Sequence, residues 1–222
     1  VYKAFSREKN VKELKDFQPV YFIRGLDRGF RNPTASCMIA VDKEDVWYQI
    51  DELYETGLTN PPLAERLKQM REGKEIEYST MDSASASDIA DLSTLGEDFL
   101  PVSKESGESR QNYVMYKVAK LTERLMSGKY FVHPKCTSTI MEFEKYRWKE
   151  KRNNLQDGNE IEEPEKSNDH MMDALGDLHV MYDYDYVEPK KKETRPAGTY
   201  VKPLEDEDES DFASETFTTD EW

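Results

Sequence analysis

Two short apolar segments that each carry an aspartate at their end constrain the fold of this chain more than any other feature. Aromatic and β-branched residues favour a buried strand within residues 20–29, where Asp27 follows the apolar core and Gly25 allows another backbone segment to approach closely. Residues 76–82 form a second such strand, which ends at Asp82. We expect both carboxylates to lie along one edge of a sheet.

The remaining periodic segments indicate more strands and several helices that cover them. Apolar residues recur at helical spacing in two segments, and Ser85 is expected to cap a third helix. Early strands followed by helices are typical of a mixed α/β domain. The expected helices cover residues 61–72, 86–95 and 109–127, and the expected strands cover residues 35–41, 46–54 and 130–132.

A third acidic group lies much later in the chain, in residues 168–175. Asp169, His170 and Asp173 fall within five residues of one expected helix, so they occupy neighbouring faces of a single turn. The apolar residues around them predict a buried helix, and such a helix seldom carries carboxylates at its buried edge unless a cation or a hydrogen-bond network satisfies them. The alternative is that these acids only interact with the positive end of the helix dipole.

The order of these three motifs resembles the nuclease domain of tailed-phage large terminases. The stretches that carry the resemblance are Gly25-Leu26-Asp27-Arg28-Gly29, the strand that ends in Met81-Asp82, and Asp169-His170-x-x-Asp173, and the likeness extends over about residues 1–185. It implies a ribonuclease-H-like fold, with a mixed central sheet flanked by helices and an inserted β-hairpin flap.

The resemblance also implies an activity and a set of partners. We expect a metal-dependent DNA endonuclease that cleaves concatemeric viral DNA during genome packaging, in the cytoplasm of the infected bacterial host. Its substrate would be double-stranded DNA. Its partners would be the ATPase domain of the same subunit, the small terminase subunit and the portal. The alternatives are another ribonuclease-H-like nuclease, of the resolvase or transposase type, and a docking module of the packaging motor.

Phosphodiester hydrolysis gives the acidic motifs a chemical reason. Two divalent ions about 3.5–4 Å apart can activate water and stabilise both the transition state and the leaving oxygen. Mg²⁺ and Mn²⁺ prefer carboxylate oxygens, and Mn²⁺ also accepts histidine. By resemblance, Asp27 would bridge both ions, Asp82 would hold one, and Asp173 with His170 would hold the other. Asp169 stays a further candidate, because some family members carry two adjacent acids where this chain has Asp169-His170.

Basic residues occur where DNA could lie. Arg24, Arg28 and Arg31 flank the first aspartate, and residues 146–163 read as a β-hairpin around an Asp-Gly turn signal. The hairpin carries the expected DNA contacts Lys149, Lys151 and Arg152. It is interpreted either as a basic flap that grips phosphates or as an ordinary solvated hairpin.

Charge and composition divide the chain into a domain and a tail. Residues 1–186 are expected to form the nuclease domain, in which residues 1–18 are the junction from an ATPase domain that this chain does not contain. Residues 187–222 are polar, and residues 205–222 hold nine acids without a basic residue, which predicts a flexible acidic tail. A docking module would bind portal or capsid through this tail.

Two further features bear on location. No apolar run in the sequence is long enough for a membrane span, so no membrane contact is expected. Cys37 and Cys136 lack a zinc-binding pattern and are expected to be buried or incidental thiols, which suits a reducing cytoplasm.

Overall fold

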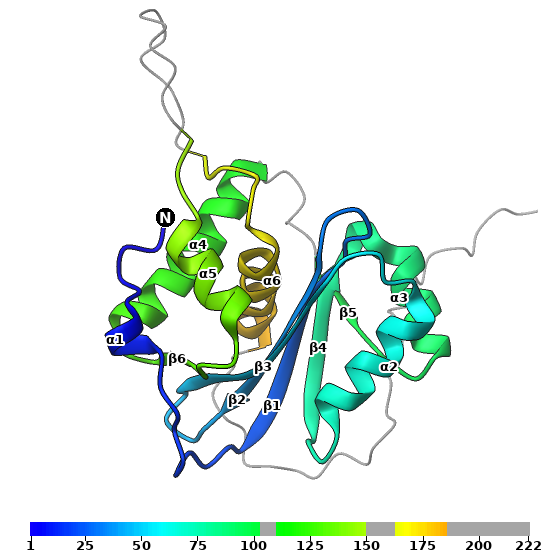
Figure 1. The fold of residues 1–222 in the computed structure, drawn as a ribbon, viewed down its shortest axis with the longest axis horizontal. Helices are drawn as coiled ribbons and strands as arrows, with labels where there is room; N and C mark the ends of the chain where they lie inside the picture. Colours follow the sequence, from blue (N-terminus) through cyan, green and yellow to red (C-terminus); the bar gives the residue numbers. More distant parts are fainter. Residues whose placement is uncertain (103–109, 150–162, 186–222) are drawn as a thin grey trace, which may run out of the picture. The chain divides into compact units, whose positions relative to one another are not determined.

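The fold is built on one mixed six-stranded sheet. The computed structural model describes residues 1–102, 110–149 and 163–185. The strand order across the sheet is β5-β4-β1-β2-β3-β6 (Figure 1). Their bounds are β1 Tyr21–Asp27, β2 Thr34–Val41, β3 Trp47–Glu55, β4 Ile76–Asp82, β5 Leu100–Val102 and β6 Tyr130–Val132.

The three long strands form an antiparallel meander, and the others extend it in parallel. β2 pairs with β1 and β3 in antiparallel register, whereas β4 runs parallel to β1, β5 parallel to β4, and β6 parallel to β3. The parallel neighbours β1 and β4 place Leu26 opposite Met81, so their carboxyl ends meet at the same edge of the sheet. The expected strands and the mixed α/β class are confirmed, whereas the short strand β5 was not expected.

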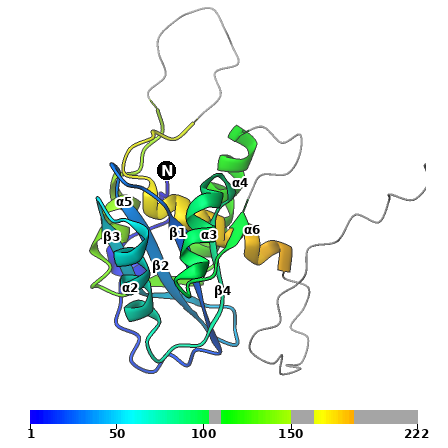
Figure 2. The ribbon, with the colours of Figure 1, turned by 90° about the vertical axis from the view of Figure 1, so that its right-hand side faces the viewer.

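Helices cover both faces of the sheet. Figure 1 shows α4, α5 and α6 on one face and α2 and α3 on the other, and Figure 2 shows α2 and α3 in front of the strands. The long helices match expectation, but α1 and α5 were not predicted. The helices are α1 Arg7–Asn10, α2 Asn60–Arg71, α3 Ala86–Thr94, α4 Arg110–Met126, α5 Thr137–Lys145 and α6 His170–Asp185, with a 3₁₀ turn η1 at Ser83–Ser85.

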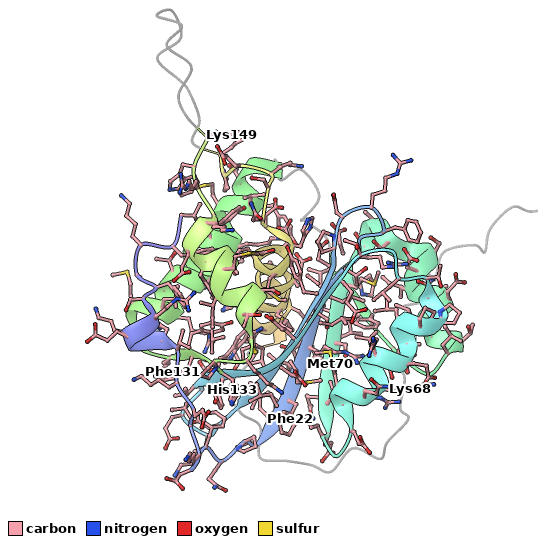
Figure 3. All side chains as sticks on the ribbon, in the orientation of Figure 1. Phe22, Lys68, Met70, Phe131, His133 and Lys149 are labelled. Atoms are coloured by element: carbon pink, nitrogen blue, oxygen red, sulfur yellow. The ribbon has the colours of Figure 1, made fainter. Side chains whose placement is uncertain are left out.

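Two apolar cores result from this layering, one on each side of the sheet (Figure 3). Ile23 of β1 belongs to the core beneath α4, α5 and α6, and Leu26 belongs to the core beneath α2 and α3. Cys37 and Cys136 are buried free thiols, as expected. No helix within the described ranges is both long and apolar enough to cross a membrane.

The helix α6 approaches β1 more closely than a side chain would permit. A Cβ atom added at Gly25 would lie 2.4 Å from the carbonyl oxygen of Ala174. The glycine in the middle of this central strand therefore has a packing function, as the sequence predicts. The contact lays the acidic first turns of α6 across the strand that ends at Asp27.

Candidate active site

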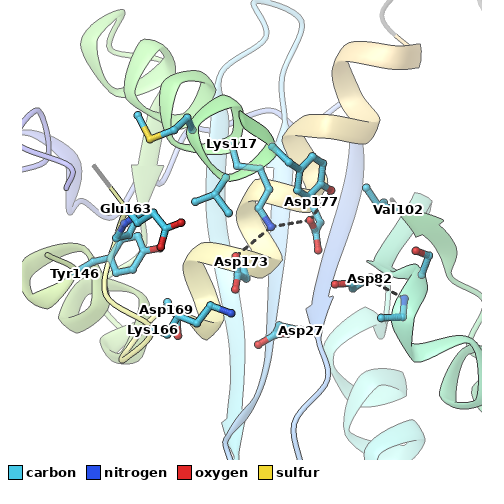
Figure 4. A pocket seen from close by; sticks show the side chains of 16 residues that line it. Asp27, Asp82, Val102, Lys117, Tyr146, Glu163, Lys166, Asp169, Asp173 and Asp177 are labelled. Atoms are coloured by element: carbon cyan, nitrogen blue, oxygen red, sulfur yellow. Dashed lines mark hydrogen bonds and ion pairs between the residues drawn. The ribbon is translucent and has the colours of Figure 1, made fainter. Parts of the chain in front are cut away.

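Carboxylates from four segments of the chain line one pocket. Its volume is about 760 Å³. Asp27 comes from the end of β1, Asp82 from the end of β4, and Glu163 from the base of the expected hairpin, while α6 and the residue before it supply the others (Figure 4). The acidic side chains that line the pocket are Asp27, Asp82, Glu163, Asp169, Asp173 and Asp177.

Asp27 is paired directly with His170. The Nδ1 atom of His170 lies 3.0 Å from Oδ2 of Asp27. Burial raises the pKa of Asp27, although the hydrogen bond from His170 opposes this effect. The same hydrogen bond is the main reason why the pKa of His170 is raised. The pair therefore shares a proton between two residues that the sequence analysis assigned to one site.

Asp82 occupies a more exposed position at the pocket rim. Its carboxylate accepts a hydrogen bond of 2.8 Å from the backbone N–H of Ala84, so it caps the 3₁₀ turn that follows β4. Ser85, which was expected to cap α3, stands at the N-cap position but makes no side-chain capping bond. The residue that caps the 3₁₀ turn is thus Asp82, which was predicted as a site residue.

Lys117 of α4 is a cation within the acidic group, and neither it nor Asp177 was predicted from the sequence. Its Nζ atom lies 3.0 Å from Oδ1 of Asp173 and 2.9 Å from Oδ1 of Asp177. Burial by itself would lower the pKa of Lys117, but the two carboxylates outweigh it and raise that pKa. Burial also raises the pKa of Asp177 to about 6. Two signals were available: Asp177 follows Asp173 by one helical turn, and Lys117 falls on the apolar stripe of its helix, three residues after Val114.

The first turn of α6 is held by Glu142, another residue that sequence reasoning missed. Glu142 of α5 is fully buried, and its Oε2 accepts the backbone N–H groups of Met171 at 2.7 Å and Met172 at 3.2 Å. Its Oε1 accepts the hydroxyl of Tyr54 at 2.7 Å. Burial raises the pKa of Glu142, whereas these hydrogen bonds oppose the increase. A negative charge interacts favourably with the positive N-terminal end of the helix dipole. The carboxylate of Glu142 therefore stabilises the first turn of α6, which carries His170.

Asp169 immediately precedes α6 and lines the same pocket. Its carbonyl oxygen accepts the N–H of Asp173 at 2.7 Å, which closes the first turn of the helix. Burial and the nearby charge of Asp173 raise the pKa of the Asp169 carboxyl. The position is compatible with both interpretations of Asp169, as a metal ligand and as an acid near the helix dipole.

Asp27, Asp82, Asp169 and Asp173 line one pocket, whereas the predicted ligand His170 is not in its lining and contacts Asp27. These residues do not converge on one point. Among the residues that the structure describes, no three His, Cys, Asp or Glu side chains are grouped closely enough to hold a metal ion. The donor set nevertheless suits a hard divalent cation, because it consists of carboxylates with one imidazole beside them. The residues therefore fit Mg²⁺ or Mn²⁺ in kind, and the assignment of Asp27, Asp82 and Asp173 as oxygen donors stays a prediction.

The expected basic contacts divide into internal and surface residues. Arg24 is buried and pairs with Glu97 at 2.7 Å, so it is not a surface contact for DNA. Arg28 is only 9% exposed, and its guanidinium donates to the carbonyls of Gly29 and Leu58 and to two side chains, which holds the loop after β1. Arg31 is exposed in that loop. DNA contact by Arg28 and Arg31 stays a prediction.

The base of the expected hairpin lies within the described residues. The N–H of Lys149 donates to the carbonyl of Glu163, and that of Glu165 donates to the carbonyl of Arg147, which is antiparallel pairing. Lys149 also forms an ion pair with Glu163. Lys151 and Arg152, with most of the hairpin, lie outside the described residues, as does the expected acidic tail. Their assignments therefore stay predictions.

Comparison with known proteins gives a consistent result. A family model described as Terminase RNAseH like domain matches residues 27–177, from the first pocket aspartate to the last. The chain is 26% identical over 187 residues to the large terminase subunit of Escherichia phage T5, which is 79% of this chain and 40% of the relative. It thus spans less than half the length of that relative.

Solved structures agree in fold. The large terminase of a thermophilic bacteriophage superposes with a TM-score of 0.68 at 21% identity, over 81% of this chain and 44% of that one. The large terminase nuclease domain from bacteriophage SPP1 with bound Mn superposes with a TM-score of 0.56 at 19% identity, over 78% of this chain and 95% of that one. The expected ribonuclease-H-like architecture is therefore confirmed.

Proposed function

The chain belongs to the family of terminase RNase H-like domains, and from this membership we propose that it is a divalent-metal-dependent DNA endonuclease of viral genome packaging. The observation that carries the proposal is the meeting of Asp27, Asp82 and Asp173 at one pocket. These residues come from three separate segments. Two-metal phosphodiester hydrolysis requires several carboxylates at one site, as here. The bound Mn of the SPP1 nuclease domain supports the choice of cofactor.

Asp27, Asp82 and Asp173, with His170 beside them, are the residues that would hold two divalent cations, Mg²⁺ or Mn²⁺. When bound, such cations lower the pKa of water and neutralise charge on phosphate oxygens. His170 keeps the Asp27 carboxylate in one orientation through their 3.0 Å contact. Glu142 keeps the turn that carries His170 in place. In this proposal the protein supplies oxygen donors for the cations, and no dedicated general base is required.

The substrate and the partners follow from the family. We propose that double-stranded concatemeric DNA is cut at this pocket, in the cytoplasm of the infected bacterium. The ATPase domain of the same subunit, the small terminase subunit and the portal would act with the nuclease. The proposed phosphate contacts are Arg28 and Arg31 after β1, and the basic residues Lys149, Lys151 and Arg152 of the expected flap.

Plasmid cleavage tests the activity directly. The purified chain is incubated with supercoiled plasmid in EDTA, Mg²⁺ or Mn²⁺, with Asp27→Asn as the control for contaminating nucleases. We expect nicking and linearisation that require the metal and disappear in the variant. Absence of cleavage with either ion, in a chain shown to be folded by circular dichroism, would contradict activity of the isolated domain.

A second function is favoured by the acidic tail. Nine acids and no basic residue in residues 205–222 would suit docking to a basic surface of the portal or capsid. Truncation after Pro203 is expected to weaken portal binding and to leave plasmid cleavage unchanged. Undiminished portal binding by the truncated chain would exclude docking through the tail.

A further inference from the structure

The buried lysine of α4 is placed by the shape of α6. The side chain of Lys117 is only 9% exposed and passes directly over Gly176. A Cβ atom at Gly176 would come within 2.8 Å of the Lys117 Cε atom. The absence of a side chain at this position of α6 therefore makes room for the lysine to reach the acidic face.

The ammonium group is surrounded by negative charge. Besides its contacts with Asp173 and Asp177, it lies 5.2 Å from the ring centre of Tyr113. Tyr113 also donates its hydroxyl to Oδ1 of Asp177 at 3.1 Å. An ammonium is strongly hydrated, so its burial is favourable only with close partners of this kind. Figure 4 shows the lysine between the two aspartates.

The two aspartates differ in what remains accessible to them. The side chain of Asp173 is 41% exposed and lines the pocket, whereas that of Asp177 is 5% exposed and accepts from both Lys117 and Tyr113. Lys117 contacts Asp173 through one oxygen, Oδ1. Lys117 thus neutralises the buried Asp177 and contacts one side of the more exposed Asp173.

We propose that Lys117 is a positioning residue of the metal site, which fixes the Asp173 carboxylate for a divalent cation and takes the place of a cation at Asp177. The inference rests on the proposed metal-dependent function. It separates the two acids of α6 into a ligand, Asp173, and a counter-ion of the lysine, Asp177. The inference also explains the glycine at position 176, because a side chain there would clash with Lys117.

Manganese binding tests this inference without relying on cleavage. Isothermal titration calorimetry with MnCl₂ is performed on the whole 222-residue chain, on Asp177→Asn, and on the double variant Lys117→Met/Asp177→Asn. Asparagine can still accept from Lys117 and Tyr113, and methionine fills the space over Gly176 without a charge. The double variant has the net charge of the unchanged chain.

The direction in which Mn²⁺ affinity changes shows whether Lys117 positions Asp173 or only repels the cation. Loss of an ammonium beside a cation site should strengthen Mn²⁺ binding by Coulomb attraction alone. We expect the opposite: at least tenfold weaker Mn²⁺ binding in the double variant than in Asp177→Asn, with equal circular dichroism spectra. Equal or tighter binding in the double variant would overturn the inference, and a tenfold loss in Asp177→Asn itself would make Asp177 a ligand and overturn it as well.

Two controls keep the test decisive. If the double variant does not fold, Lys117→Arg keeps the charge but changes its geometry, and at least threefold weaker Mn²⁺ binding is expected. Unchanged binding in Lys117→Arg would then overturn the inference. Lack of Mn²⁺ binding by the unchanged chain would overturn the metal-dependent function itself, which is a different outcome from equal binding by the variants.

Discussion

Individual carboxylates of the pocket should differ in their importance for cleavage. Asp27→Asn and Asp173→Asn remove proposed metal ligands, so each should lower cleavage by about a hundredfold or more while the fold survives. Asp169→Asn should have a smaller effect, because this residue also stands at the start of α6. Plasmid nicking in Mn²⁺ measures the three variants. Substantial activity in Asp27→Asn or Asp173→Asn would remove that residue from the ligand set.

Asp177 should make the metal-free protein less stable as the pH rises. Its folded pKa is about 6 against an ordinary value of 3.8, so its contribution to stability is complete below about pH 4 and is lost as the pH rises through 6. The groups that face it are Lys117, Tyr113, Asp173 and Asp82. The shift corresponds to about 3 kcal/mol in all, and most of it is lost between pH 4 and 7.

Urea unfolding in EDTA at several pH values measures that contribution. Asp177→Asn cannot titrate at this position, so its free energy of unfolding should fall less over the same range than that of the unchanged chain. Parallel pH profiles for the two proteins would contradict the assignment. The comparison is made without metal because a bound cation would favour the ionised carboxylates.

Some residues of the pocket could be predicted from the sequence and others could not. The position of Asp27, Asp82 and Asp173 at one pocket was predictable, because each stands in a short motif at the end of a strand or within one turn of a helix. Lys117 and Glu142 were not predicted, because their roles depend on partners far away in the chain. For Lys117, the local signal was a charged residue on an apolar helical stripe.

At the scale of elements, α5 should stabilise α6 through a single carboxylate. Glu142→Ala removes the acceptor of two backbone N–H groups and of the Tyr54 hydroxyl, so it should cost about 2–3 kcal/mol in urea unfolding. Glu144→Ala on the same helix is the matched control, because its carboxylate pairs with Arg7 at the surface. Similar small losses in both variants would show that the cap contributes little.

The packing of α6 on β1 should be equally sensitive. Gly25→Ala would place a Cβ atom 2.4 Å from a carbonyl oxygen, so α6 must move, at a cost of about 2 kcal/mol or more. Cleavage should fall too, because Asp27 and Asp173 would separate. Gly57→Ala is the control: it has open space and only a positive φ of 73°, so it should cost about 1 kcal/mol and keep cleavage. Full activity in Gly25→Ala would contradict this account.

The expected flap is the element that the structure describes least, and its role is open to a direct test. Deletion of residues 149–160 should weaken DNA affinity and cleavage, because it removes the proposed phosphate contacts Lys149, Lys151 and Arg152. A gel-shift titration with duplex DNA, compared at two salt concentrations, measures the loss. Unchanged affinity and cleavage would exclude the flap from the mechanism.

For the whole molecule, the order of strands and helices was predictable and the layering followed from it. Strand propensity and turn signals located the meander, and helical periodicity located the covering helices. The short elements α1 and β5 were not predicted, because three or four residues carry little periodic signal. The helix α5 was not predicted because its buried face includes the polar residues Thr139 and Glu142. Their positions depend on tertiary packing, as with the pairing of β5 to β4.

The contact between α6 and β1 has a consequence for the timing of biosynthesis. His170 meets Asp27 across 143 residues of sequence, and the helix that brings it there is the last element in the described part of the chain. A ribosome that has made only the sheet has therefore produced the first aspartates without the last. Nascent and prematurely ended chains should be harmless to nearby DNA, since the proposed nuclease site is complete only when α6 has been synthesised and has packed on β1.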